Sequence, residues 1–297
     1  MRTRATVPAP VLVLLAIASV QVGSAIARTL FDDFGASGVT LLRLGIAAVV
    51  LGLITRPRVR GWSAAAWRAA ALLGVVMAGM NLLFYLSLRT VPLGTAVTVE
   101  FLGPLLLAVV QTRRLVDLLW AALAAAGVLL LGLDGGGPGG GSAPFSGLLL
   151  AFLAGLCWAG YIVLSARLGG LVPGTGGLTV SLAVGALLVL PFGASGAAAV
   201  VDHPQLLIGA TAVALLSSVI SYGLEINALR HIPTQVFGIL MSLEPAAAAL
   251  AGLIVLHQRL GPVEIVALLL VSLASAGVTL FRRADRPAPA PAETPRG

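Results

Sequence analysis

Residues 88–104, LRTVPLGTAVTVEFLGP, and residues 229–245, LRHIPTQVFGILMSLEP, share the pattern Leu-Arg-x-x-Pro followed by a second Pro twelve residues after the first. Equivalent positions of the two stretches are 141 residues apart. A self-match at one fixed offset in an apolar chain indicates an internal duplication. In membrane proteins, two repeated halves are typical of transporters that hold the substrate between the halves, near the middle of the membrane. The pattern therefore predicts a duplicated carrier.

The composition predicts an all-α integral membrane protein surrounded by a lipid bilayer. The 297 residues are 59% hydrophobic and only 10% charged, and the mean hydropathy is +1.05. Soluble domains carry about 25% charged residues, and a spanning helix needs about 20 mostly apolar residues. About ten such stretches occur, at residues 11–30, 38–54, 65–87, 95–110, 115–133, 147–164, 177–191, 206–224, 235–256 and 263–281.

The distribution of basic residues predicts the orientation of these spans. With ten spans and a cytoplasmic N-terminus, only Arg28, Arg89 and Arg259 of the 18 basic residues fall in loops on the outer side, whereas most fall on the cytoplasmic side. Cytoplasmic loops carry such an excess of positive charge. We therefore expect both termini in the cytoplasm, and we attribute the net charge of +7 to this asymmetry rather than to nucleic-acid binding.

The N-terminus also has features of a cleaved signal peptide. Arg2 and Arg4 precede an apolar run, and Ala25-Ile26-Ala27 resembles a cleavage site. Cleavage would leave nine spans and disturb the charge asymmetry, so we favour an uncleaved first helix.

A glycine-rich run divides the chain into two halves. Residues 135–144 interrupt the apolar pattern and are typical of a flexible linker. We predict a first repeat of five helices at 1–134, a second repeat of five helices at 145–283, and a disordered cytoplasmic tail at 284–297. Because five is an odd number, the second repeat begins on the opposite side of the membrane, and the two repeats are inverted.

Ionisable residues inside the spans are the first candidates for function, because burying a charge in a bilayer costs at least about 2.5–3.5 kcal/mol. They are Arg43, Glu100, Glu225 and Glu244. At the repeat offset, Glu244 aligns with Gly103, three residues after Glu100, so both carboxyl groups project from nearly the same face of equivalent helices. A structural hydrogen bond to a neighbouring helix is the alternative role for each.

These four residues suggest a mechanism of exchange. Low dielectric disfavours the charged form of a carboxyl group, which then holds a proton until water or a cationic amine arrives. Proton and substrate amine would compete for Glu100 or Glu244, with Glu225 as a third candidate. Arg43 would bind the substrate carboxylate.

Polar and aromatic residues of other spans complete the predicted substrate site. Asn81 aligns with Tyr222 at the repeat offset, and each lies one helical turn from another polar residue. The whole set is Asn81, Tyr85, Tyr222, Gln21, Trp158 and Tyr161. Hydrogen bonding between helices and simple packing are the alternatives for these residues.

The sequence contains no pattern that predicts a cofactor, a metal site or an enzyme. The one cysteine, Cys157, lies inside an apolar span, and the three His lie at loops or span ends without partners at metal-ligand spacing. A nucleophile–base motif is also absent from the sequence. We therefore expect no cofactor, no metal and no enzymatic reaction.

Several of these stretches resemble a known family. They are residues 21–24, 79–87, 90–94, 100–104 and 240–246. The chain resembles the drug/metabolite transporter superfamily with two EamA-type repeats, specifically the bacterial inner-membrane threonine/homoserine exporters. The resemblance implies ten helices in two inverted repeats and export of small hydrophilic amino acids by proton exchange. The family often has Gly-Glu after the ninth span, where this chain has His257-Gln258.

Two other functions remain as alternatives. A broader drug or metabolite exporter would have the same fold with a different cavity. A membrane-embedded enzyme or sensor would belong to another class, but the sequence offers neither a catalytic motif nor a soluble output domain.

Overall fold

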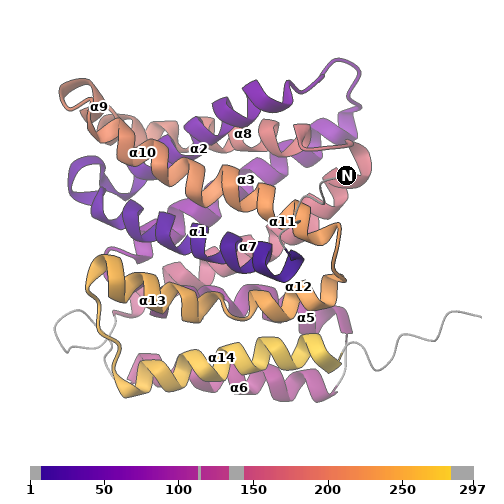
Figure 1. The fold of residues 1–297 in the computed structure, drawn as a ribbon, viewed down its shortest axis with the longest axis vertical. Helices are drawn as coiled ribbons and strands as arrows, with labels where there is room; N and C mark the ends of the chain where they lie inside the picture. Colours follow the sequence, from indigo (N-terminus) through magenta and orange to yellow (C-terminus); the bar gives the residue numbers. More distant parts are fainter. Residues whose placement is uncertain (1–7, 113–114, 134–143, 282–297) are drawn as a thin grey trace, which may run out of the picture.

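The structure, a computed structural model, describes residues 8–112, 115–133 and 144–281. These residues form a bundle of helices (Figure 1). In the first half the helices are α1 (Ala9–Thr29), α2 (Phe31–Thr55), α3 (Ala64–Ser87), α4 (Leu93–Glu100), α5 (Leu102–Thr112) and α6 (Leu115–Leu133). In the second half they are α7 (Phe145–Leu171), α8 (Gly176–Ala197), α9 (Ala199–Asp202), α10 (Leu206–Ala214), the π-helix η1 (Leu215–Ile220), α11 (Ser221–Leu229), α12 (Thr234–Met241), α13 (Glu244–Leu256) and α14 (Pro262–Phe281).

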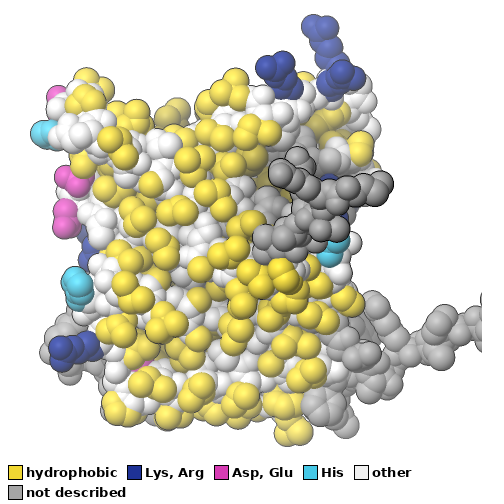
Figure 2. Space-filling view, viewed as in Figure 1, with side chains coloured by type: hydrophobic (Ala, Val, Ile, Leu, Met, Phe, Trp, Pro, Cys, Tyr) yellow, Lys and Arg dark blue, Asp and Glu magenta, His cyan; other side chains and the backbone are white. Residues whose placement is uncertain are grey.

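The surface of the bundle is suited to lipid. Nine helical stretches of the described residues are long and apolar enough to cross a membrane, and Leu118–Leu131 in α6 is a shorter apolar stretch. Large side chains such as Leu53 and Ile254 are 70% exposed. Figure 2 shows hydrophobic side chains over the middle of one face, with charged side chains and histidines at the two ends of the helices. The prediction of an all-helical membrane protein is confirmed.

Several of the predicted spans had boundaries that were too narrow, and α2 and α7 differ most from the prediction. Helix α2 begins at Phe31 rather than at residue 38, because Asp32 and Asp33 stand in its first turn, where carboxylates are favoured by the helix dipole. Gly35, with a φ of 66°, separates this first turn from the rest of α2. Helix α7 continues to Leu171 rather than ending at residue 164, and carries Arg167 on its last turns.

Two crossings of the bundle are interrupted at equivalent places. The stretch 93–112 is divided between α4 and α5 at Phe101, and the stretch 234–256 is divided between α12 and α13 at Ser242 and Leu243. Pro104 and Pro245 stand in the first turn of the second segment of each crossing. Proline is tolerated there because the first N–H groups of a helix have no intrahelical acceptor. The linking residues Phe101, Ser242 and Leu243 keep right-handed helical backbone angles, so each interruption is a local irregularity within one helical stretch.

The first break packs directly on the backbone of α7. A Cβ atom on Gly103 would overlap the carbonyl oxygen of Gly155, and a Cβ atom on Gly155 would overlap the carbonyl oxygen of Glu100. Only glycine permits two helices to approach so closely. This contact fixes the position of Glu100 relative to α7.

Helices of the first half find extensive partners in the second half. Helix α2 packs on α8, α3 on α7, α6 on α14, α4 on α13, and α1 on α11. Figure 1 shows α6 and α14 side by side at the lower edge of the bundle.

One end of the bundle is closed by a hydrophobic cluster. Phe31, Phe34, Leu88, Val91 and Leu93 are buried together where α1 meets α2 and α3 meets α4. We call this end, at the left of Figure 1, the closed end. The predicted linker 135–144, apart from Pro144, and the predicted tail 284–297 lie outside the described residues.

Candidate functional site

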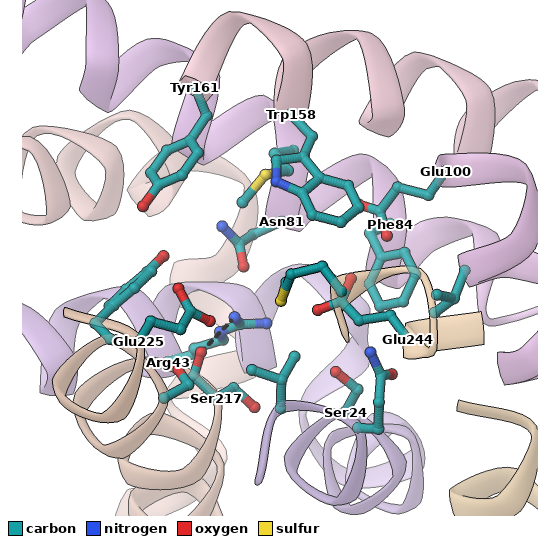
Figure 3. A pocket seen from close by; sticks show the side chains of 17 residues that line it. Ser24, Arg43, Asn81, Phe84, Glu100, Trp158, Tyr161, Ser217, Glu225 and Glu244 are labelled. Carbon is teal, nitrogen blue, oxygen red and sulfur yellow. Dashed lines mark hydrogen bonds between the residues drawn. The ribbon is translucent and has the colours of Figure 1, made fainter. Parts of the chain in front are cut away.

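A central cavity of about 120 Å³ lies inside the bundle (Figure 3). Its lining comes from α1, α2, α3, α4, α7, η1, α11, α12 and α13. Nine of the ten residues that the sequence predicted for a substrate site line this cavity. They are Gln21, Arg43, Asn81, Glu100, Trp158, Tyr161, Tyr222, Glu225 and Glu244. The structure therefore brings together residues from seven of the predicted spans, whereas the repeat pattern pointed only to spans three, four, eight and nine.

Arg43 is held in the wall of the cavity by three hydrogen bonds. Its Nη1 donates to the hydroxyl of Tyr85 at 2.9 Å, its Nη2 donates to the carbonyl oxygen of Ser217 at 3.0 Å, and its Nε donates to Oγ of Ser218 at 3.4 Å. All three acceptors are neutral, so these bonds leave the positive charge of the guanidinium uncompensated. The side chain is 7% exposed, and its positive charge acts on the carboxyl group of Glu100, which lines the same cavity.

Tyr85 is the predicted site residue that does not line the central cavity. Its side chain is fully buried, and its ring lies 5.5 Å from the guanidinium carbon of Arg43. Phe31 packs against the same ring, at a centroid distance of 5.6 Å. Tyr85 therefore orients Arg43 and connects it to the closed end.

One acceptor of Arg43, the carbonyl oxygen of Ser217, lies in a π-helical segment. Residues Leu215–Ile220 form a π-helix, in which the hydrogen-bond ladder is rearranged by one residue. Within it, the carbonyl oxygen of Leu216 accepts a bond of 2.7 Å from Oγ of Ser19, and that of Ser217 accepts the bond from Arg43. This segment therefore joins α1, α2 and the cavity, and π-helical turns occur frequently at functional sites. No periodicity in the sequence signals it.

Three carboxyl groups face the same space as this one guanidinium. Glu100 ends α4, Glu244 begins α13, and Glu225 lies in α11. The positive charge of Arg43 acts on Glu100, whereas Glu244 interacts electrostatically with the other two carboxyl groups. Figure 3 shows Arg43 and Glu225 together on one side of the cavity, with Glu244 nearer to Glu100. Such a lining accommodates protons or a cationic ligand group next to an anionic one.

Aromatic rings form the wall contributed by α7 and α11. Trp158 contacts Phe101 edge to face at 5.1 Å, and the rings of Tyr161 and Tyr222 stack at a centroid distance of 6.4 Å. Aromatic faces next to carboxyl groups favour an ammonium group through cation–π attraction.

Helices α1 and α3 add amides and hydroxyls. Gln21 and Ser24 line the cavity, one helical turn apart, whereas Gly23 packs on η1, where a Cβ atom would overlap Oγ of Ser217. One face of α1 therefore lines the cavity, and Gly23 beside it provides close packing on η1. Asn81 donates from Nδ2 to the carbonyl oxygen of Met77 at 2.8 Å, and lines the cavity as well.

A second cavity of about 410 Å³ adjoins the first on the side away from the closed end. Four residues line both cavities: Trp158, Tyr161, Glu225 and Met241. The second cavity reaches residues at the opposite end of the bundle, including Ala108 in α5, Leu229 in α11 and Thr279 in α14. The central cavity is therefore covered at one end by the hydrophobic cluster and adjoins a larger space at the other.

Sequence reasoning missed a buried carboxyl group outside the cavity. Glu264, in the first turn of α14, is 7% exposed; its Oε2 accepts from Gly261 N at 2.7 Å and its Oε1 from Thr95 Oγ1 at 3.2 Å. Gln258, which stands where the resemblance implies a carboxylate, accepts from the backbone N–H of Leu93 at 3.0 Å. Both side chains tie the start of α4 to the α13–α14 connection. An acidic residue in a first helical turn was the available signal for Glu264.

Among the described residues, no group of three or more His, Cys, Asp or Glu side chains is placed to hold a metal ion. Cys157 is a free, partly buried cysteine in α7.

Comparisons with known proteins agree on one family. Residues 145–280 match the EamA-like transporter family. The chain is 40% identical, over 93% of its length, to the threonine/homoserine exporter RhtA of Escherichia coli strain K12, of which the match covers 92%. The same protein of Salmonella typhimurium strain SL1344 is also 40% identical, with 93% of each chain covered.

A solved crystal structure has the same fold at low sequence identity. It superposes with a TM-score of 0.55 over 93% of this chain and 99% of its own, with 17% identity. Together with the sequence matches, which extend over most of both chains, this similarity leads to one conclusion. The chain belongs to the family of the threonine/homoserine exporter RhtA, among the EamA-like transporters.

Proposed function

We propose that the protein is a secondary active exporter of small hydrophilic amino acids of the threonine and homoserine type, and that it exchanges them for protons. One observation carries the proposal: a single guanidinium and three carboxyl groups face one small cavity inside a membrane-type bundle. An amino acid carries one carboxylate and one ammonium group, and each finds a complementary partner there. The printed name of the 40% identical relatives supports the substrate class.

The cavity also suggests how exchange proceeds. The substrate carboxylate binds Arg43, which is already held in position by Tyr85 and Ser217. The ammonium group then competes with a proton for Glu100 or Glu244, with Glu225 as the third candidate. Because one carboxyl group cannot hold both at once, export of the amino acid is coupled to entry of a proton.

The overall architecture that we propose has ten crossings in two inverted repeats, residues 1–134 and 145–283. Supporting it, the breaks at Phe101 and Ser242 lie 141 residues apart, the same offset as the sequence motif. Pro92 and Pro233, also 141 residues apart, precede α4 and α12 with nearly the same backbone angles. The pairing of helices also supports it: contacts of α3 with α7 and of α1 with α11 exchange under a two-fold relation between the halves. Helix α6 would supply the remaining crossing.

We propose that the protein spans the bacterial inner membrane many times, with both termini in the cytoplasm. The asymmetric distribution of Arg supports this orientation. The closed end would then face outward, and the second cavity would face the cytoplasm, as in an inward-facing carrier. Reporter fusions test the orientation: a phosphatase that is active when fused to the C-terminal tail would contradict it.

The decisive experiment measures transport by the purified protein in liposomes. Efflux of labelled threonine should accelerate when the outside is made acidic relative to the inside, because protons then flow inward in exchange. Empty liposomes, and proteoliposomes treated with a protonophore, are the controls. Efflux at the same rate with and without the pH gradient would rule out proton exchange, and absence of any amino-acid flux would rule out the proposed function.

Accessibility of the cavity offers a test independent of transport. Asn81→Cys and Tyr222→Cys, each in a Cys157→Ala background, place a thiol in the lining of the cavity. A water-soluble thiol reagent should modify both, and threonine should slow the reaction. If neither thiol reacts in any trapped conformation, the cavity is not part of a transport pathway.

A broader drug or metabolite exporter is the second candidate. The second cavity, at about 410 Å³, favours it, because ligand pockets for drug-sized molecules range from about 300 to 1,000 Å³. A panel of apolar amines in the liposome assay separates the two functions. We do not propose an enzyme, since the 40% identical relatives are named as exporters.

A further inference from the structure

The closed end is held by polar contacts between the two halves as well as by its hydrophobic cluster. The backbone N–H of Leu93, the first residue of α4, donates to Oε1 of Gln258 at 3.0 Å. The hydroxyl of Thr95, also in α4, donates to Oε1 of Glu264 at 3.2 Å. Gln258 lies in the connection between α13 and α14, and Glu264 lies in the first turn of α14. Each bond therefore joins the first half of the chain to the second.

The local structure explains why these acceptors reach α4. Pro92, which precedes α4, supplies no side-chain cap, so the first N–H group of this helix needs an acceptor from elsewhere. Gly252 leaves the space for that acceptor, because a Cβ atom there would lie 2.8 Å from Oε1 of Gln258. Glu264 caps its own helix by accepting from the N–H of Gly261 through Oε2 at 2.7 Å, and this leaves its other carboxyl oxygen for α4.

The equivalent helices at the other end of the bundle are apart. At the repeat offset of 141 residues, α4 corresponds to α12 and α13 corresponds to α5. Helices α4 and α13 pack closely, and a Cβ atom on Gly94 would lie 2.9 Å from Cα of Ala249. Among the described residues, α12 and α5 make no comparable contact, and both line the second cavity instead. A carrier opens its two ends in turn, so the contact of α4 with α13 is the one that must separate when the closed end opens.

We propose that Gln258 and Glu264 form a latch that holds the closed end shut and sets how often it opens. The proposal rests on the proposed function, in which the cavity is reached from the two ends in turn. Opening breaks only the two bonds to α4, because the bond between Glu264 and Gly261 lies within the start of α14. Water that enters the open end hydrates the released donors and acceptors, so the net contribution of each bond is small and the latch is reversible.

The experiment measures the opening of each end in the purified full-length protein in detergent, where a water-soluble thiol reagent reaches both ends. In a Cys157→Ala background, Val91→Cys reports on the closed end, because Val91 is buried in its hydrophobic cluster. Ser165→Cys reports on the opposite end, because Ser165 lines the second cavity. The reaction rates of the two thiols follow the populations of the two open states, without a transport measurement and whatever the orientation in the membrane.

Two substitutions weaken the latch through different bonds. Gln258→Met keeps the length of the side chain and removes its acceptor, so Val91→Cys should react about threefold to tenfold faster, the effect of one lost hydrogen bond. Thr95→Val removes the hydroxyl bonded to Glu264, keeps the shape of the side chain, and should act in the same direction. In both variants Ser165→Cys should react no faster than with the latch intact, and it should react more slowly as the closed end opens more often.

A buried hydrogen bond in another helix contact provides the matched control. The hydroxyl of Ser181 in α8 donates to the carbonyl oxygen of Ala70 in α3 at 2.9 Å. Ser181→Ala removes this bond between helices but leaves the latch intact, so the reaction rates of both reporter thiols should stay unchanged.

The two reporters together decide the proposal. Acceleration of both thiols by Gln258→Met would overturn it, because a loosened fold would then explain the result, and an unchanged rate for Val91→Cys would overturn it as well. If Gln258→Met does not fold, Thr95→Val and Gly252→Ala, which displaces the acceptor atom of Gln258, decide in its place. Failure of the latch leaves threonine transport by the wild type unaffected, whereas a wild type that transports no amino acid refutes the proposed function itself.

Discussion

The first and second halves of the bundle face the central cavity with different side chains on a similar backbone. Helices α1–α4 contribute the guanidinium of Arg43, the amides of Gln21 and Asn81, and one carboxyl group, that of Glu100. Helices α7–α13 contribute two carboxyl groups and the rings of Trp158, Tyr161 and Tyr222. An amino acid has one anionic and one cationic end, so two identical walls would bind it poorly.

A single pair of equivalent positions shows how far the halves have diverged. Gly103 in α5 and Glu244 in α13 are 141 residues apart and both follow a break in a crossing. In the first half this position has no side chain, and the backbone of Gly155 occupies the space. In the second half it carries a carboxyl group of the cavity. The position after the interruption thus serves close helix packing in the first half and lines the cavity with a carboxyl group in the second half. The first half carries its own carboxyl group three residues earlier, at Glu100.

The largest effect should come from removing the titratable group of the first half. Glu100→Gln keeps the size of the side chain but cannot release a proton, so efflux driven by a pH gradient should fall to background, a loss of at least about a hundredfold. The variant should still insert and fold. Glu244→Gln should act similarly if the two halves are equivalent in coupling, and retention of wild-type pH dependence by both variants would show that the proton site lies elsewhere.

A buried carboxyl group outside the cavity provides the matched control. Glu264→Gln keeps the acceptor oxygen for one of the two hydrogen bonds made by Glu264. Its transport rate should keep the pH dependence of the wild type, measured at several internal and external pH values. If Glu264→Gln abolishes coupling as completely as Glu100→Gln, the effect is not specific to the cavity.

The close contact of Gly155 with the end of α4 predicts that a larger side chain at position 155 lowers the stability of the protein. Gly155→Ala forces apart α7 and the carbonyl oxygen of Glu100, and such overpacking costs about 1–3 kcal/mol. Thermal unfolding in detergent should therefore begin at a lower temperature. Gly169→Ala, in the same helix, meets open space and should be neutral or slightly stabilising. Equal melting temperatures for the two variants would contradict the close contact.

The smallest effect should come from the residue that orients Arg43. Tyr85→Phe removes the hydrogen bond of 2.9 Å that the charged guanidinium of Arg43 donates, and leaves the ring and the other two hydrogen bonds of Arg43 in place. The threonine concentration that gives half-maximal transport should rise severalfold, while the maximal transport rate changes little. A fall in the maximal rate with unchanged half-saturation would assign Tyr85 to the conformational change instead.

The repeated features of the backbone were predictable because they leave a local signal. Pro92, Pro104 and their equivalents marked the helix starts and the breaks, and Arg43, Glu100, Glu225 and Glu244 stood out because charges are rare in spans. Periodicity placed most helix ends to within a few residues, but it missed the beginning of α2, where Asp32 and Asp33 stand, and the ends of α7 and α8.

What depends on three-dimensional contact left no such signal. Tyr85 was grouped with Asn81 because they lie one turn apart, but the side chain packs behind Arg43 instead of facing the cavity. The π-helix lies where η1 packs on α1 and α2, and there the buried carbonyl oxygen of Ser217 accepts the hydrogen bond from Arg43. The sequence named single residues of α1, α2 and α7 as candidates, but that these helices meet around one cavity follows from pairing between the halves, which a repeat within one chain does not specify.

That pairing has a consequence for the order of events during synthesis. Helices α2, α3 and α6 leave the ribosome before their partners α8, α7 and α14 exist. Individual helices are stable in a bilayer before they associate, so the first half must wait in the lipid as separate, mobile segments. The polar side chains of Arg43 and Glu100 stay exposed to lipid or to the insertion machinery during that time. Assembly is completed only when translation passes α14, and a chain released earlier would leave helices of the first half without their partners.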